Sequence, residues 1–169
     1  VKIATGSSTA PIDWLASQTP RGGTVAVDGQ VLGLGMAKLL NTALQAAGVD
    51  LRTDADLLAA VWPQRPGLPA QPVYEHLPPQ AVQPRAAKLA AVRESVARLG
   101  ATHHFVSSVD DLAWITNLRG SDVSYNPVFL GHLLLDLTGG TLFVGAGKIG
   151  ADLTARLAAD GLRLAPYEE

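Results

Sequence analysis

The sequence predicts an α/β protein: a small mixed β-sheet with flanking helices, preceded by part of a similar lobe. Short apolar stretches typical of strands alternate with longer segments whose apolar residues keep helical spacing. Hydrophobic residues make up 47% of the 169 residues and charged residues 17%, which favours a folded chain with a buried core. Most of the 11 prolines fall in one central stretch, so we expect two folded regions with a link between them.

Residues 1–62 are expected to form the C-terminal part of a first α/β lobe. Its clearest element is a helix over 34–47, because apolar residues recur there at helical spacing and Gly48 stands where a left-handed residue ends a helix. Asp54 is expected to cap a last helical turn that reaches Val61. The other expected elements are a helix over 11–17, a strand and turn over 24–29 and a strand over 49–52.

Residues 63–84 contain seven prolines and are expected to be a semi-rigid linker. Proline has no backbone N–H and restrains the residue before it, so this stretch should hold neither a helix nor a central strand. The predicted division of the chain is therefore 1–62, 63–84 and 85–169.

Residues 85–169 are expected to form a complete middle α/β domain that opens with a long helix ended by Gly100. The expected apolar stripe of this helix is Leu89, Val92, Val96 and Leu99. Its expected polar positions are Arg85, Lys88, Arg93 and Arg98.

The rest of this region alternates strands and helices. Ser108 and Asp111 have the spacing of a capping box that starts a helix. The short connection over 138–140 predicts a hairpin, and hence antiparallel strands on either side of it. The expected elements are strands over 102–107, 128–137, 141–144 and 162–164, with helices over 108–115 and 148–160.

The run GAGKIG over residues 145–150 matches the glycine pattern of dinucleotide-binding turns. It follows a predicted strand, opens a predicted helix and has Glu168 near the distance of a ribose-binding acid. However, the preceding strand is expected in a hairpin and the motif comes late in the domain, so a tight turn is the simpler interpretation. A nucleotide-binding module that uses Gly145, Gly147 and Gly150 remains the alternative.

Charge and composition argue against several classes of function. The chain has 13 Lys+Arg, 15 Asp+Glu and no basic block, which disfavours nucleic-acid and membrane-surface binding. With no Cys there is no disulfide, thiolate metal site or cysteine nucleophile, and we expect a cytoplasmic protein. His103 and His104 adjoin on a predicted strand and should face opposite ways, so no metal site or catalytic group is predicted. The chain starts at Val1 rather than Met, and we expect it to be part of something longer.

One polar loop, residues 117–127, stands out as a candidate site. Arg119 is placed to clamp Asp122 with two hydrogen bonds, and Asn126 before Pro127 favours a turn into the next strand. Either Arg119, Asp122 and Asn126 satisfy one another and the loop backbone, or the loop is a surface offered to a substrate or a neighbouring domain.

Two runs of this sequence resemble a known enzyme family. Residues 110–129 read DDLAWITNLRGSDVSYNPVF, and residues 61–66 read VWPQRP. The first closely resembles the signature of the middle domain of three-domain Xaa-Pro aminopeptidases (aminopeptidase P, in the creatinase/prolidase superfamily), and the second resembles their link between the first two domains. The resemblance implies mixed-sheet α/β folds for both regions, as expected above.

The resemblance also implies a parent enzyme that removes an N-terminal residue before proline, using two divalent metal ions, usually manganese. In that family the ligands are two Asp, one His and two Glu on a C-terminal catalytic domain, and none can be assigned to this chain. The implied partners are that downstream domain, a peptide with penultimate proline, and other copies in an oligomer. We therefore expect a non-catalytic region that helps to enclose the substrate cleft and supports assembly, or else a free-standing assembly module.

Overall fold

The structure, a computed structural model, describes residues 8–169. The chain divides into two compact units, Val1–Pro66 and Gly67–Glu169, and each is described by itself. Within 8–169, no helix has both the length and the apolar character that a membrane span requires.

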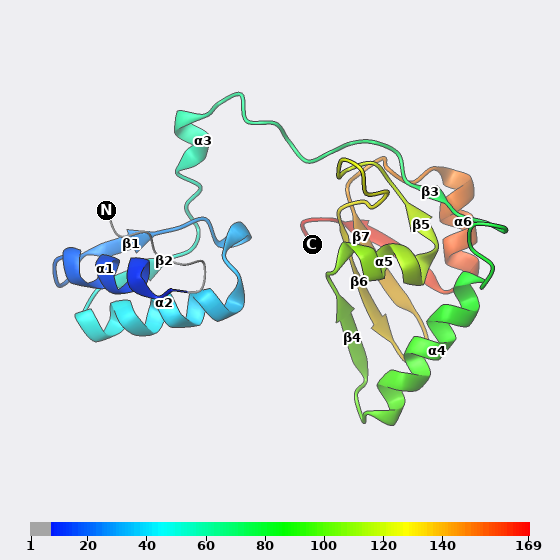
Figure 1. The fold of residues 1–169 in the computed structure, drawn as a ribbon, viewed down its shortest axis with the longest axis horizontal. Coiled ribbons are helices and arrows are strands. Elements are labelled where there is room, and N and C mark those ends of the chain that lie inside the picture. The colour runs from blue at the N-terminus through cyan, green and yellow to red at the C-terminus, as the bar shows by residue number, and fades with distance from the viewer. Residues whose placement is uncertain (1–7) are drawn as a thin grey trace. The chain divides into compact units, whose positions relative to one another are not determined.

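The first unit packs two helices onto a two-stranded sheet (Figure 1). β1 (Thr24–Ala26) and β2 (Asp50–Arg52) pair in parallel. The core of this unit is a cluster of apolar side chains from both helices and from the residue before β2: Ile12, Leu40, Leu44 and Val49. The unit's other elements are α1 (Ala10–Gln18), the 3-10 helix Gly29–Val31, α2 (Leu34–Ala47) and α3 (Leu58–Val61).

Helix α2 has the bounds that the sequence predicts, and Gly48 ends it with a φ of 71°. The prediction that Asp54 caps the last helical turn of this unit is wrong. Asp54 pairs instead with Arg52, whose Nε lies 3.0 Å from its Oδ1. Asp56 accepts hydrogen bonds from the backbone N–H groups of Leu58 and Ala59 and so caps the first turn of α3.

The second unit is a two-layer α/β domain, with three helices packed on one face of a mixed four-stranded sheet (Figure 1). The sheet order is β4-β6-β7-β8, with β6 antiparallel to both β4 and β7, and β7 parallel to β8. The hairpin prediction is therefore confirmed. Its elements are β3 (Tyr74–Glu75), α4 (Arg85–Arg98), β4 (His103–Val106), α5 (Val109–Thr116), β5 (Leu118–Arg119), β6 (Gly131–Asp136), β7 (Gly140–Val144), α6 (Ala151–Ala159) and β8 (Leu162–Pro166).

Strand alternation creates the core of the second unit. Residues at every second position of β6 are buried against the helices, as the pleat of a half-covered sheet requires. The largest fully buried side chains of this core are Leu89, Leu112, Leu118, Phe129, Leu133, Leu135, Leu142, Leu157 and Leu162. Leu99, expected on the stripe of α4, is 84% exposed because α4 ends at Arg98.

Part of the proline-rich stretch folds with the second unit. β3 pairs with β5 in antiparallel register, Tyr74 opposite Arg119. Flanking backbone bonds run from Val73 N to Lys148 O (2.8 Å) and from His76 N to Asn117 O (2.8 Å). β3 is one strand of a short two-stranded ribbon rather than a central strand, so it fits between the prolines of this stretch.

Candidate functional site

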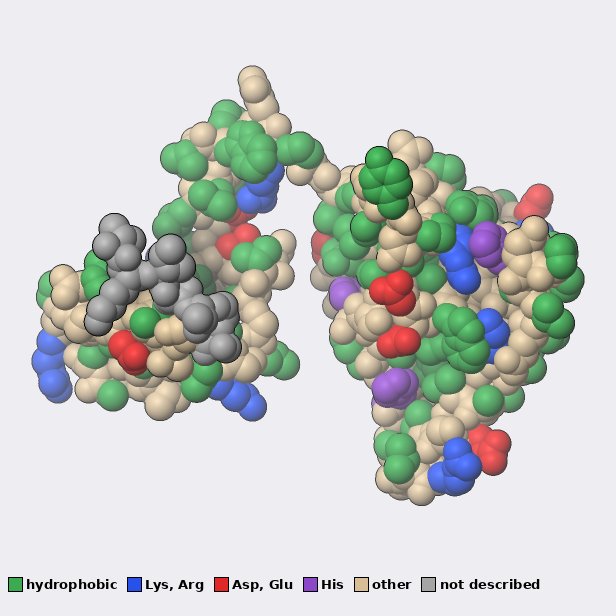
Figure 2. Space-filling view, viewed as in Figure 1, with side chains coloured by type: hydrophobic (Ala, Val, Ile, Leu, Met, Phe, Trp, Pro, Cys, Tyr) green, Lys and Arg blue, Asp and Glu red, His purple; other side chains and the backbone are tan. Residues whose placement is uncertain are grey.

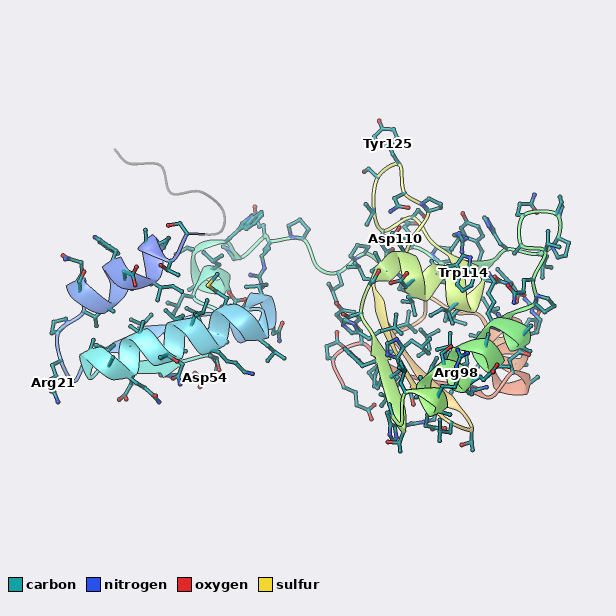
Figure 3. The ribbon with its side chains drawn as sticks, turned by 60° about the horizontal axis from the view of Figure 1, so that its bottom comes forward. Arg21, Asp54, Arg98, Asp110, Trp114 and Tyr125 are labelled. Atoms are coloured by element: carbon teal, nitrogen blue, oxygen red, sulfur yellow. The ribbon has the colours of Figure 1, made fainter. Side chains whose placement is uncertain are left out.

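The candidate loop runs from β5 to β6 and is closed by its own backbone. Gly120 N donates to Pro127 O (3.2 Å) and Asp122 N donates to Val128 O (3.2 Å). The tip is Tyr125, which has a φ of 62°, is fully exposed and stands clear of the domain in Figure 3. The base of the loop is thus closed by backbone hydrogen bonds, while its tip projects into solvent.

Arg119 binds helix α5 rather than Asp122. Its Nη1 donates to Ala113 O in the last turn of α5 (2.7 Å) and to Leu118 O in β5 (2.8 Å). The expected clamp between Arg119 and Asp122 is therefore wrong. A helix end leaves backbone carbonyls unpaired, and these attract the cation.

Asp122 points into the domain, where Lys148 is its ionic partner. One carboxylate oxygen, Oδ2, accepts from Leu130 N (2.8 Å) and from the Lys148 amine. The same amine donates to Pro69 O (3.2 Å). Lys148 is not among the predicted site residues. Its place as a lysine inside the glycine-rich turn was the one sequence feature that could have drawn attention to it. The pair joins the candidate loop to the turn over 145–150.

Asn126, the third predicted residue, reaches the opposite end of α5. Its Nδ2 donates to Asp110 Oδ1 (3.2 Å), and Asp110 lies in the first turn of that helix. The loop does not bring Arg119, Asp122 and Asn126 together. Arg119 and Asn126 fix it to two positions along α5, and Asp122 fixes it to Lys148.

Lys88 is a buried cation beside the same helix end, although it was expected at a solvent-facing polar position. Its amine donates to Trp114 O (2.8 Å) and Asn117 Oδ1 (2.7 Å), and lies 4.1 Å from the centroid of the Trp114 ring. Burial lowers the pKa of the Lys88 amine, and the positive charge of Arg119 lowers it further.

Arg85 is the second misjudged polar position of α4, with only 5% exposure. It donates to Glu75 Oε1 (2.7 Å), to Asp160 Oδ2 (2.7 Å) and to Thr116 O (3.2 Å). Arg156 donates to the other oxygen of Glu75 (3.0 Å). Arg85 stands four residues before Leu89, on the apolar face of α4, and that spacing was the sequence signal for its burial.

The strand before the glycine-rich turn, β7, has a neighbour on each side, and the predicted hairpin accounts for only one of them. β7 pairs with β6 as expected, but it also pairs in parallel with β8 through α6. The one basic side chain of the turn, Lys148, is 3% exposed and bonded inside the domain, so it is not presented to a phosphate. A hollow of about 290 Å³ lies at this end of the sheet, with Gly145, Gly147 and Glu168 in its wall.

No group of three or more His, Asp or Glu side chains within residues 8–169 is arranged to hold a metal ion. His103 and His104 occupy successive positions of β4, opposite Asp136 and Leu135 of β6. Two carboxylates of the second unit, Glu75 and Asp160, are already engaged in ion pairs with Arg85.

Comparison with known proteins identifies the family of the second unit. Residues 64–169 match the family described as Creatinase/Prolidase N-terminal domain. The chain belongs to this family. The match confirms the resemblance of residues 110–129, and it places the creatinase/prolidase N-terminal domain over both the candidate loop and the helix α5 that supports it.

Relatives and a solved structure extend the similarity of this creatinase/prolidase N-terminal domain to almost the whole chain. A protein named "Probable Xaa-Pro aminopeptidase P" from Metarhizium acridum is 35% identical over 159 residues, 92% of this chain and 26% of the relative. One of the same name from Sordaria macrospora is 30% identical, over 99% of this chain and 28% of its own length. The chain thus spans about a quarter of the length of these relatives.

The crystal structure of an X-prolyl aminopeptidase from Caenorhabditis elegans, described as a cytosolic enzyme with a di-nuclear active site, superposes with a TM-score of 0.84. It covers 98% of this chain and 27% of the nematode chain at 23% identity. At that identity the likeness concerns the fold, and it confirms the predicted mixed α/β architecture.

Proposed function

We propose that this chain is the non-catalytic N-terminal region of an Xaa-Pro aminopeptidase, an enzyme that removes the residue before a penultimate proline. The observation that carries the proposal is the match of nearly the whole chain to about a quarter of proteins named for that activity. In this role residues 1–62 complete a first lobe, residues 63–84 link it onward, and residues 85–169 form the middle domain beside the catalytic part.

The two metal ions of the proposed parent enzyme do not belong to this chain. A dinuclear centre, such as the nematode enzyme is described to have, needs several carboxylate and imidazole ligands that converge on the two ions. The His, Asp and Glu side chains of residues 8–169 do not converge in this way, so they do not fit such a centre. In the proposal, two divalent ions, manganese by family resemblance, are held elsewhere in a cytoplasmic enzyme.

The proposed contribution of the second unit is a rigid wall. The candidate loop, residues 117–127, is fixed at three points, through Arg119, Asp122 and Asn126, and presents Tyr125 outward. A loop held in this way loses little entropy when it contacts a substrate or another domain. The loop therefore suits a role in enclosing a peptide cleft and in supporting assembly.

Hydrolysis of an Xaa-Pro peptide tests the proposal in two arms. The purified chain with Mn²⁺ should show no turnover, and chelator-sensitive turnover would overturn the non-catalytic role. A chimera of the Metarhizium acridum relative that carries this chain in the matching region should cleave the peptide, whereas the relative without that region should not. Sedimentation of both proteins distinguishes support of assembly from enclosure of the cleft, and saturable binding of NAD or ATP to the chain would favour the nucleotide alternative.

A further inference from the structure

Three cations meet the C-terminal end of helix α5. Arg119 donates to Ala113 O, Lys88 to Trp114 O and Arg85 to Thr116 O. One or two such contacts suffice to cap a helix, because the end of its dipole carries only about half a negative charge. The group is therefore more strongly positive than the helix end requires.

The acidic partners of these cations are unevenly distributed. Arg85 is neutralised by Glu75 and Asp160. Lys88 and Arg119 form no ion pair with any carboxylate of residues 8–169, and their hydrogen bonds all go to neutral oxygens. Two positive charges against about half a negative one leave roughly one and a half uncompensated charges in a partly buried place.

Arg119 keeps one side of its guanidinium group free. Only Nη1 makes hydrogen bonds, while Nε and Nη2 bond to nothing in residues 8–169 and are not enclosed by them. Trp114, whose ring lies beside the Lys88 amine, is 53% exposed. In Figure 2, basic side chains adjoin hydrophobic ones on the face over α4 and α5.

We propose that Arg119, Lys88 and Trp114 form a binding subsite for a peptide carboxylate. The free Nε and Nη2 edge of Arg119 offers two parallel donors, which match the two oxygens of a carboxylate. The Lys88 amine, 4.1 Å from the centroid of the Trp114 ring, adds positive charge, and the half-exposed Trp114 side chain offers apolar surface to the chain next to the carboxylate. The inference rests on the proposed function only in taking the carboxylate to be that of a peptide.

Two kinds of peptide carboxylate have this chemistry, and three peptide probes distinguish them. Acetyl-Ala-Pro-Ala with a free C-terminus presents a terminal carboxylate, and its C-terminal amide presents none. Amidated acetyl-Ala-Glu-Ala presents only a side-chain carboxylate. Each peptide is titrated into the isotope-labelled chain while the indole N–H resonance of Trp114 is followed, with Trp114→Phe used to assign that resonance.

We expect saturable shifts with one or both carboxylate peptides and none with the amide of the first. Arg119→Gln should weaken binding about tenfold or more, because charge-assisted hydrogen bonds are lost. Arg119→Lys should restore part of it, since the charge returns without the paired donors. The matched control is Arg98→Gln, which removes an exposed arginine of α4 bonded only to Ser95 and should leave binding unchanged.

Equal binding of the amide, unchanged binding by Arg119→Gln, or no saturable shift with millimolar carboxylate peptide would each overturn the subsite. Far-ultraviolet circular dichroism checks that the Arg119→Gln variant is folded. If that variant does not fold, the binding of Arg119→Lys is compared with that of the unaltered chain instead. Inorganic phosphate serves as a further probe, and tighter binding of phosphate than of either carboxylate would also overturn the assignment. Binding is measured without catalysis, so this result is independent of whether the parent enzyme is an aminopeptidase.

Discussion

Lys148 and Asp122 form an ion pair inside the second unit, with side chains only 2% and 0% exposed. The pair connects the glycine-rich turn to the candidate loop, two segments that are separate in the sequence. The sequence predicts Asp122 as a candidate for contacts with a substrate or a neighbouring domain, and Lys148 lies within the glycine-rich motif of the nucleotide alternative. Their side chains instead hold the domain together, and what the loop offers outward is its tip.

Breaking this pair should strongly destabilise the second unit. Asp122→Asn leaves the Lys148 amine buried without a counter-charge, and the free energy of unfolding should fall by about 3–5 kcal/mol. Lys148→Met in the same background should recover part of that loss. Urea unfolding of both single variants and the double variant gives the coupling energy. The control is Arg52→Gln in the exposed pair with Asp54, where a loss of at most about 1 kcal/mol is expected; additive losses at 122 and 148 would contradict a coupled pair.

Gly120 should not tolerate a side chain. A Cβ at this position would lie 2.7 Å from Phe129 Cβ and 3.1 Å from Val128 O, and Phe129 is fully buried. Gly120→Ala should therefore lower the free energy of unfolding by about 1–3 kcal/mol through overpacking. Gly35→Ala is a matched control, because nothing lies within 4 Å of its added Cβ and α2 should gain about 0.5–1 kcal/mol. An unchanged melting temperature in Gly120→Ala would mean that the backbone at the base of the loop shifts to make room for the added Cβ.

Asp136 should contribute to the acid limb of stability. Its Oδ1 accepts from Thr138 N (2.7 Å) and Gly139 N (2.6 Å), and these backbone bonds lower the pKa of the carboxyl group from 3.8 to about 2. Between these two pH values the unfolded chain binds more protons than the folded one, so stability rises with pH across that window. The contribution is present above about pH 4 and lost as the pH falls through 2. Acid unfolding of Asp136→Asn, followed by circular dichroism, should lack this step; an unchanged acid limb would contradict it.

The sequence predicted elements where local rules decide and missed contacts that only the fold creates. Helix α2 and its end at Gly48 follow from spacing and from glycine's access to positive φ, and Ser108 accepts from Asp111 N as its motif predicts. The partner of Asp122 lies 26 residues further along the chain, and no local pattern relates the two.

The buried cations of α4 could not have been assigned for a related reason. Helical spacing places Arg85 and Lys88 near the apolar face, but a basic residue is normally assigned to solvent. Their acceptors are Glu75 of β3 and carbonyls at the end of α5, which approach α4 only in the folded domain. Arg119 stays a candidate site residue, but its expected partner is wrong, because the carbonyl of Ala113 near the end of α5 accepts its hydrogen bond instead of the Asp122 carboxylate.

Asn117 should be the most sensitive position between α5 and the loop. It is 5% exposed, has a φ of 55°, accepts from the Lys88 amine through Oδ1 and donates from Nδ2 to Gln83 O (2.9 Å). Asn117→Gly loses the two side-chain bonds but keeps easy access to the left-handed region, and it should lower the free energy of unfolding by about 1–3 kcal/mol. Asn117→Ala loses the same bonds and adds about 1–2 kcal/mol of backbone strain.

The difference between the two Asn117 variants therefore measures the conformational contribution alone, and the Gly variant measures the bonds. Chemical unfolding of both variants gives the two values. Equal losses would mean that the backbone relaxes out of the left-handed region when the side chain is removed. A loss in Asn117→Ala with none in Asn117→Gly would mean that Lys88 and Gln83 find other partners, and that the end of α5 is fixed by Arg119 and Arg85 without Asn117.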